Sequence, residues 1–82
     1  MEIKDKYHVQ LKEKRWGVFE ISLVTDDFKR AKRFCAAMVA FNHHVQEGRV
    51  IDFSKPSFEN IAYLVSKDNA LNHLREMIEG EL

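Results

Sequence analysis

Residues 7–25, YHVQLKEKRWGVFEISLVT, decide the fold. Apolar and polar residues alternate before and after a charged segment, which is the period of a half-buried β-strand. Gly17 supplies the backbone freedom that a turn between the two runs needs. The stretch therefore predicts a β-hairpin. Its expected core side chains are Tyr7, Val9, Leu11, Phe19, Ile21 and Leu23.

The opposite face of this hairpin also carries apolar residues. By alternation Trp16, Val18 and Val24 point away from the core, and Ala62 and Leu64 are candidates to join them. Two helices on one side of a sheet leave its other side uncovered. An apolar patch on such a face is typical of a protein interface.

The spacing changes to that of a helix from about residue 26 to residue 42. Thr25 is the expected N-cap, and Asp26 and Asp27 place negative charge where the helix dipole favours it. One arc of this helix is apolar and is expected to face the core. Its members are Phe28, Ala31, Phe34, Cys35, Met38, Val39 and Phe41. Ala36, Ala37 and Ala40 lie across from it, where they either admit a partner backbone or simply favour helix.

The second half of the chain repeats the order of elements. Residues 46–49 predict a turn, followed by a short strand over 50–53. Residues 56–65 fit either a helix or a strand, and we prefer a strand because 61–65 is short and rich in β-branched and aromatic residues. A last helix follows Ser66, with Gly80 at its end.

The predicted order is ββαββα within one domain spanning residues 1–82. We expect an α+β protein: a two-layer sandwich in which an antiparallel sheet of four or five strands carries both helices on one face.

Composition narrows the class of protein. The chain has 82 residues, 13 basic and 13 acidic side chains and one cysteine, which excludes an intrachain disulfide framework. Its longest apolar run, residues 34–41, is too short to span a membrane. We expect no membrane contact and a cytoplasmic location in which Cys35 stays reduced.

No motif for catalysis or for a cofactor is evident. The three glycines are isolated, so no phosphate-binding loop can be assembled from them. Cys35 falls on the apolar arc of a helix, where a thiol is usually structural. A metal site combining His8, His43 or His44, His73 and Asp52 is disfavoured because the spacing matches no ligand pattern. We therefore expect neither an enzyme nor a metal or cofactor protein.

Charge is distributed unevenly along the chain. Residues 1–33 hold nine basic and six acidic side chains, whereas residues 34–82 hold four and seven. We predict a protein-binding module, a small regulator, adaptor or inhibitor that occludes or bridges a larger protein, with a homodimer as a further expectation. Its predicted contact residues are Trp16, Val18, Val24, Lys29, Arg30, Lys32 and Arg33.

The alternative is a nucleic-acid-binding protein, the second choice of partner. It would use two basic segments, the hairpin turn over 12–16 and the first turns of the helix over 29–33. The residues concerned are Lys12, Lys14, Arg15, Trp16, Lys29, Arg30, Lys32 and Arg33. This interpretation requires the two segments to meet on one surface.

Overall fold

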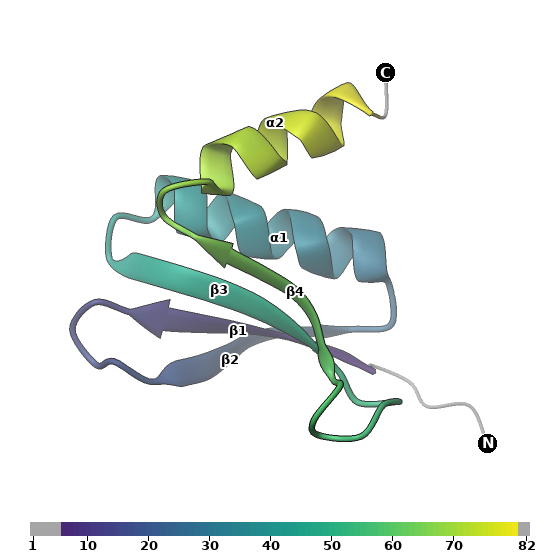
Figure 1. The fold of residues 1–82 in the computed structure, drawn as a ribbon. Helices are drawn as coiled ribbons and strands as arrows, with labels where there is room; N and C mark the ends of the chain where they lie inside the picture. The colour runs from purple at the N-terminus through teal and green to yellow at the C-terminus, as the bar shows by residue number, and fades with distance from the viewer. Residues whose placement is uncertain (1–5, 81–82) are drawn as a thin grey trace.

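The structure, a computed structural model, describes residues 6–80. Its elements follow in the order ββαββα and all strand neighbours are antiparallel, in the sheet order β2-β1-β3-β4. Both helices lie on one side of the sheet (Figure 1). The predicted α+β class, element order and layering are confirmed, with a sheet of four strands. The elements are β1 (Tyr7–Glu13), β2 (Phe19–Thr25), α1 (Phe28–Phe41), β3 (Val45–Asp52), β4 (Ile61–Ser66) and α2 (Ala70–Glu79).

The β1–β2 hairpin forms where the alternation predicts it. Gly17 adopts a φ of 68°, the left-handed region that a Cβ disfavours, and its N–H donates to the Glu13 carbonyl at 3.1 Å. Trp16 and Val18 belong to this turn and not to a strand. They therefore lie beyond the end of the paired sheet.

Helix α1 is capped two residues later than expected. The Asp27 carboxylate accepts a hydrogen bond from the Arg30 N–H at 3.2 Å, which makes Asp27 the N-cap. Thr25 instead accepts from the Asp27 N–H through its hydroxyl, also at 3.2 Å. At the other end, the Lys67 ammonium donates to the carbonyls of Val39 and Asn42 at 2.9 and 2.7 Å.

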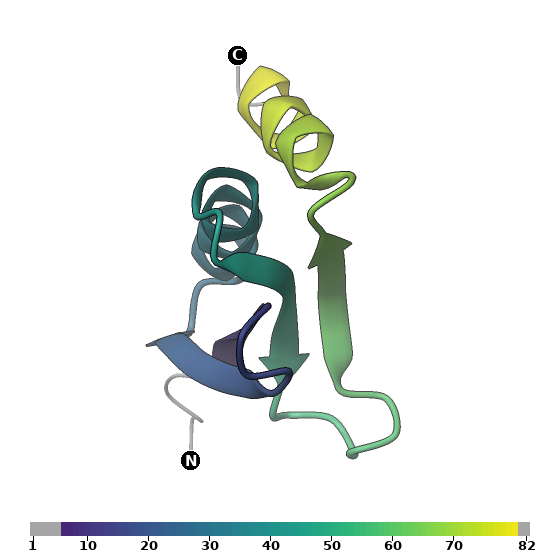
Figure 2. The same cartoon turned by 90° about the vertical axis from the view of Figure 1, so that its left-hand side faces the viewer.

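The core lies between the sheet and α1. Ala31, Cys35 and Val39, each one helical turn apart, are fully buried. Ala36 is fully buried as well, because α2 packs beside α1 (Figure 2). Phe41 was predicted to lie on the buried arc, and this was wrong: its side chain is 69% exposed at the end of the helix.

Strand β3 corrects the prediction of a turn over residues 46–49. These residues lie within an eight-residue strand that pairs with β1 on one side and β4 on the other. Gly48, taken as a turn residue, lies beneath α1. A Cβ there would come within 2.6 Å of the Cys35 Sγ and 2.8 Å of a Val39 methyl. The glycine is needed for close packing, not for a turn.

The ambiguous segment before residue 66 is a strand, as we preferred. Strand β4 covers its apolar run and forms one edge of the sheet, while Pro56 lies in the preceding loop. Helix α2 begins later than expected, with Asn69 as N-cap; the Ser66 N–H donates to the Asn69 side chain at 3.1 Å. Gly80 ends this helix, as predicted.

Candidate functional site

The side of the sheet away from the helices is uncovered, and we call its side chains the open face. Residues directly opposite in an antiparallel pair share a face. Because Val9 and Val50 are opposite each other and buried under α1, the neighbouring pairs His8–Ile51, Gln10–Arg49 and Lys12–Glu47 point the other way. The same register places side chains of the edge strands beside them. The members from the edge strands are Phe19, Ile21, Val24, Ile61 and Leu64.

A β-bulge in β2 decides what this face contains. Val9 pairs with Leu23 while Gln10 pairs with Ile21, so Ser22 is the extra residue. The expectation that Phe19 and Ile21 lie in the core was therefore wrong. Both turn to the open face, and the Ile21 side chain is 58% exposed, whereas Leu23 packs against the core as predicted. One extra residue exchanges the two faces of a strand.

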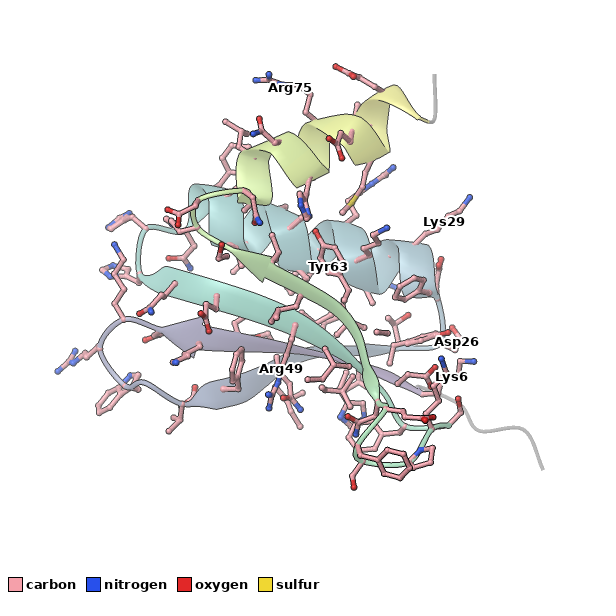
Figure 3. All side chains as sticks on the ribbon, viewed as in Figure 1. Lys6, Asp26, Lys29, Arg49, Tyr63 and Arg75 are labelled. Carbon is pink, nitrogen blue, oxygen red and sulfur yellow. The ribbon has the colours of Figure 1, made fainter. Side chains whose placement is uncertain are left out.

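Arg49 occupies the middle of the open face. Its guanidinium lies 3.9 Å from the centroid of the Phe19 ring, and its Nε donates to the Gln10 side chain at 2.8 Å. Figure 3 shows Arg49 on the side of the sheet away from the helices, whereas Tyr63 lies between sheet and helices. The nearby Lys12 ammonium is 3.8 Å from the Glu47 carboxylate. The Arg49 head group is thus held in one place by two strands.

Aliphatic side chains border Arg49 on both sides. Ile21 and Val24 project from β2, and Ile61 and Leu64 project from β4. All four are exposed, Leu64 to 57% of its surface. Among the described residues, these four side chains form two apolar margins of the open face, one on each edge strand. Most of the open-face side chains between them, on β1 and β3, are polar.

The sequence analysis missed the centre of this surface. Val24 lies on the open face, as predicted, and Leu64 joins it. Arg49 was assigned to a turn, so its face was never considered. The signal was present in the alternation of Glu47, Arg49 and Ile51 with small or apolar residues between them. A strand with one buried and one open face has that period.

The other predicted contact residues lie elsewhere. Trp16 and Val18 sit at the hairpin turn, where the Arg15 guanidinium is 5.0 Å from the Trp16 ring. Lys29 lies at the start of α1, at the opposite end of the molecule (Figure 3). Lys29, Lys32 and Arg33 line a hollow of about 230 Å³ between the two helices. Arg30 shares a neighbouring hollow on the flank of α1.

The two basic segments do not meet on one surface. α1 begins next to the end of β2 that is remote from the hairpin turn (Figure 1). Lys14 and Arg15 instead line a hollow of about 440 Å³ with His43 and His44 from the α1–β3 loop. The Lys14 N–H donates to the His44 carbonyl at 3.0 Å, which joins the two loops.

A fourth hollow, of about 300 Å³, lies between the helices and β4. Its walls include Lys32, Tyr63, His73 and Glu76. Burial, followed by the proximity of Cys35 and Glu76, raises the pKa of Tyr63 to about 12. The phenol therefore stays protonated at neutral pH. Its oxygen lies 2.9 Å from the His73 Nδ1, within hydrogen-bond distance.

The side chains that were considered and disfavoured as metal ligands, His8, His43, His44, His73 and Asp52, form no ligand group in the described part of the chain. Across residues 6–80, no group of three or more histidine, cysteine, aspartate or glutamate side chains is arranged to hold a metal ion. Burial raises the pKa of the Cys35 thiol to about 12. Nor does any helix in this part of the chain have the length and apolar character needed to cross a membrane.

Comparison with known proteins adds no assignment. No protein family, curated protein or solved structure matches this chain. The open face, the hairpin turn with the adjacent histidines of the α1–β3 loop and the hollows beside the helices are therefore judged on their own geometry.

Proposed function

We propose that this chain is a protein-binding module, a small regulator or adaptor whose partner docks on the open face of the sheet. The observation that carries the proposal is the combination of exposed aliphatic margins with one arginine held between them. Interfaces commonly concentrate their binding energy in a central, well-packed arginine or aromatic residue with apolar residues around it. The open face has that arrangement around Arg49.

Exposed apolar side chains elsewhere are more scattered. Leu71 and Ile78 project from α2, Phe41 ends α1 and Phe58 lies in the β3–β4 loop. Single exposed apolar residues are normal on protein surfaces. Within residues 6–80, the open face is where several of them border a side chain that is already fixed by cation–π and hydrogen-bond contacts. This favours the open face over the α1 cations as the binding surface.

The test compares matched variants of the full chain as baits. Leu64→Ser and Ile21→Ser remove apolar surface from the open face, while Leu71→Ser and Ile78→Ser remove similar surface from α2. Each bait is incubated with an extract of the source cells, and bound proteins are quantified by mass spectrometry. We expect a protein in stoichiometric amount that both open-face variants lose and both α2 variants retain. A partner lost equally by all four variants, or by none, contradicts the proposal.

Two narrower expectations belong to this proposal. We expect the chain and its partner to meet in the cytoplasm, where a buried thiol such as Cys35 is expected to stay reduced. A second copy of this chain is one partner to test first, because a small domain gains buried surface by association. Light scattering of the wild type and of Leu64→Ser decides whether the open face joins two copies.

Nucleic acid remains the alternative partner, favoured by one observation. Lys14 and Arg15 at the hairpin turn line a hollow with Glu13, His43 and His44, and the Arg15 guanidinium lies over the Trp16 ring. Cationic, aromatic and titratable groups are thus close together at this end of the molecule. The α1 cations cannot contribute to that same contact. Fluorescence polarisation with single-stranded DNA and RNA tests it. Affinity that falls steeply with salt and is lost in Lys14→Gln and Arg15→Gln would support nucleic-acid binding over the protein partner.

A further inference from the structure

We infer that the partner of the open face presents a carboxylate side chain to Arg49, between the apolar margins of this face. The inference rests on the proposed function and specifies the chemistry of the partner. It follows from how the guanidinium is held, from which of its donors are used and from what surrounds it.

The Arg49 head group is prepared for a ligand. An exposed arginine usually samples many rotamers, and ordering it on binding costs conformational entropy. Here the stack on Phe19 from β2 and the hydrogen bond to Gln10 from β1 already restrict the side chain. A partner that contacts the guanidinium meets it in a defined position.

Most of the donors of this guanidinium are unused. An arginine has five N–H groups, and the Nε of Arg49 donates its hydrogen to Gln10. Across residues 6–80, the Nη atoms have no hydrogen-bond acceptor and no carboxylate forms an ion pair with Arg49. The neighbouring Glu47 carboxylate lies 3.8 Å from the Lys12 ammonium. The charge of Arg49 is therefore available.

Covering this charge requires an acceptor in the partner. A partner that packs on Ile21, Val24, Ile61 and Leu64 removes water from the guanidinium between them. A charge buried without a counter-charge is strongly unfavourable. A carboxylate matches two parallel N–H donors of a guanidinium and satisfies this requirement best within a protein surface.

The surroundings favour a carboxylate over the phosphates of a nucleic acid. A phosphate backbone is usually bound by several cations that converge from different elements. On the open face, the second cation, Lys12, already has Glu47 as its partner. The margins are aliphatic, and the Phe19 ring that a base could stack on is occupied by Arg49. An acidic residue flanked by apolar residues fits this surface.

The experiment uses a random library of linear 12-residue peptides displayed on phage, selected on the immobilised full chain. Enriched peptides are synthesised, and their affinities for the wild type, Arg49→Gln, Arg49→Lys and the control Arg75→Gln are measured by calorimetry. We expect enriched peptides to carry an aspartate or glutamate among apolar residues. Arg49→Gln should weaken binding roughly tenfold or more, Arg49→Lys less, and Arg75→Gln not at all.

A double-mutant cycle isolates the pair. Changing the peptide acid to its amide should weaken binding to the wild type but have little further effect on Arg49→Gln. Equal effects in both backgrounds would overturn the inference. So would enriched peptides without an acid, or a single-stranded DNA 12-mer that binds more tightly than the peptides through Arg49.

The same measurements separate this inference from the proposed function. If Ile21→Ser and Leu64→Ser abolish peptide binding while Arg49→Gln does not, the open face binds proteins but the carboxylate inference is wrong. If none of these variants affects binding, or if selection enriches no peptide, both are wrong. Circular dichroism of each variant confirms that it is folded before its affinity is interpreted.

Discussion

Gly48 of β3 packs directly against Cys35 of α1: a Cβ on Gly48 would lie 2.6 Å from the Cys35 Sγ. Cβ atoms essentially never approach another atom so closely, and both residues are buried between α1 and the sheet. The distance between α1 and β3 at this point therefore depends on the absence of a side chain at this glycine.

Replacing Gly48 should therefore lower the stability of the fold, and the size of the loss should depend on the side chain at position 35. We expect Gly48→Ala to lower the free energy of unfolding by about 1–3 kcal/mol, because the added methyl group overpacks the core. Combined with Cys35→Ala, which vacates the space of the sulfur, the loss should be smaller than the sum of the two single losses by about 1 kcal/mol. Urea unfolding of the two single variants and the double variant measures this coupling.

Gly17→Ala is the control for this cycle. Its cost arises from a φ of 68° in an open turn, with no atom within 4 Å of the added Cβ. That cost should add to the Cys35→Ala cost without coupling. Additive losses for Gly48→Ala as well would show that the contact with Cys35 is not what requires the glycine.

The thiol of Cys35 should be nearly unreactive in the folded protein. Its side chain is fully buried and its pKa is raised to about 12, so very little thiolate exists at pH 8. Labelling by a thiol reagent should require opening of the fold and be slower than in the unfolded chain by roughly 10³-fold or more. Absorbance with an aromatic disulfide reagent follows the reaction. Rapid labelling without denaturant would contradict this placement.

The Lys67 side chain should stabilise the end of α1. Its ammonium donates to the carbonyls of Val39 and Asn42, near the negative end of the helix dipole. We expect Lys67→Met to lower the free energy of unfolding by about 1–2 kcal/mol, allowing for partial solvent exposure. Lys14→Met, which removes an exposed ammonium, is the control and should change it by less than about 0.5 kcal/mol. Thermal unfolding of both variants is the measurement, and equal losses would refute the capping role.

Acid should remove a stabilising contact at the end of β3. The Ser54 hydroxyl and N–H both donate to the Asp52 carboxylate, at 2.6 and 2.9 Å, and hold the pKa of Asp52 below its ordinary value of 3.8. Since the pKa is lower in the folded state, the stabilisation is present above pH 3.8 and is lost as the pH falls through the folded pKa.

The pH dependence of the variants tests this assignment. Unfolding of the wild type in urea between pH 6 and pH 2.5 should show a fall in stability at the acid end that is shallower in Asp52→Asn. Asp68→Asn, which removes an exposed carboxylate on the β4–α2 loop, should leave the wild-type slope nearly unchanged. Parallel slopes in all three proteins would show that the Ser54 contact does not perturb Asp52.

The sequence by itself determined the elements and their order. The alternation of 7–12 and the arc that includes Ala31, Cys35 and Val39 depend on the local period of strand and helix, which persists in any context. From these periods the α+β class, the hairpin, α1 and α2 follow. Sheet and helix must then pack face to face, so an uncovered second face of the sheet follows as well.

Only the tertiary structure decided what that second face contains. One extra residue, Ser22, turns Phe19 and Ile21 from the core to the open face, and period alone does not reveal a bulge. Gly48 is a residue type common in turns, but it lies in a strand, at a position where the approach of α1 leaves no room for a Cβ. Because Gly48 faces α1, the next residue of the strand, Arg49, points to the open face. The two basic segments likewise lie apart because of the direction that the chain takes in space, which the local sequence does not encode.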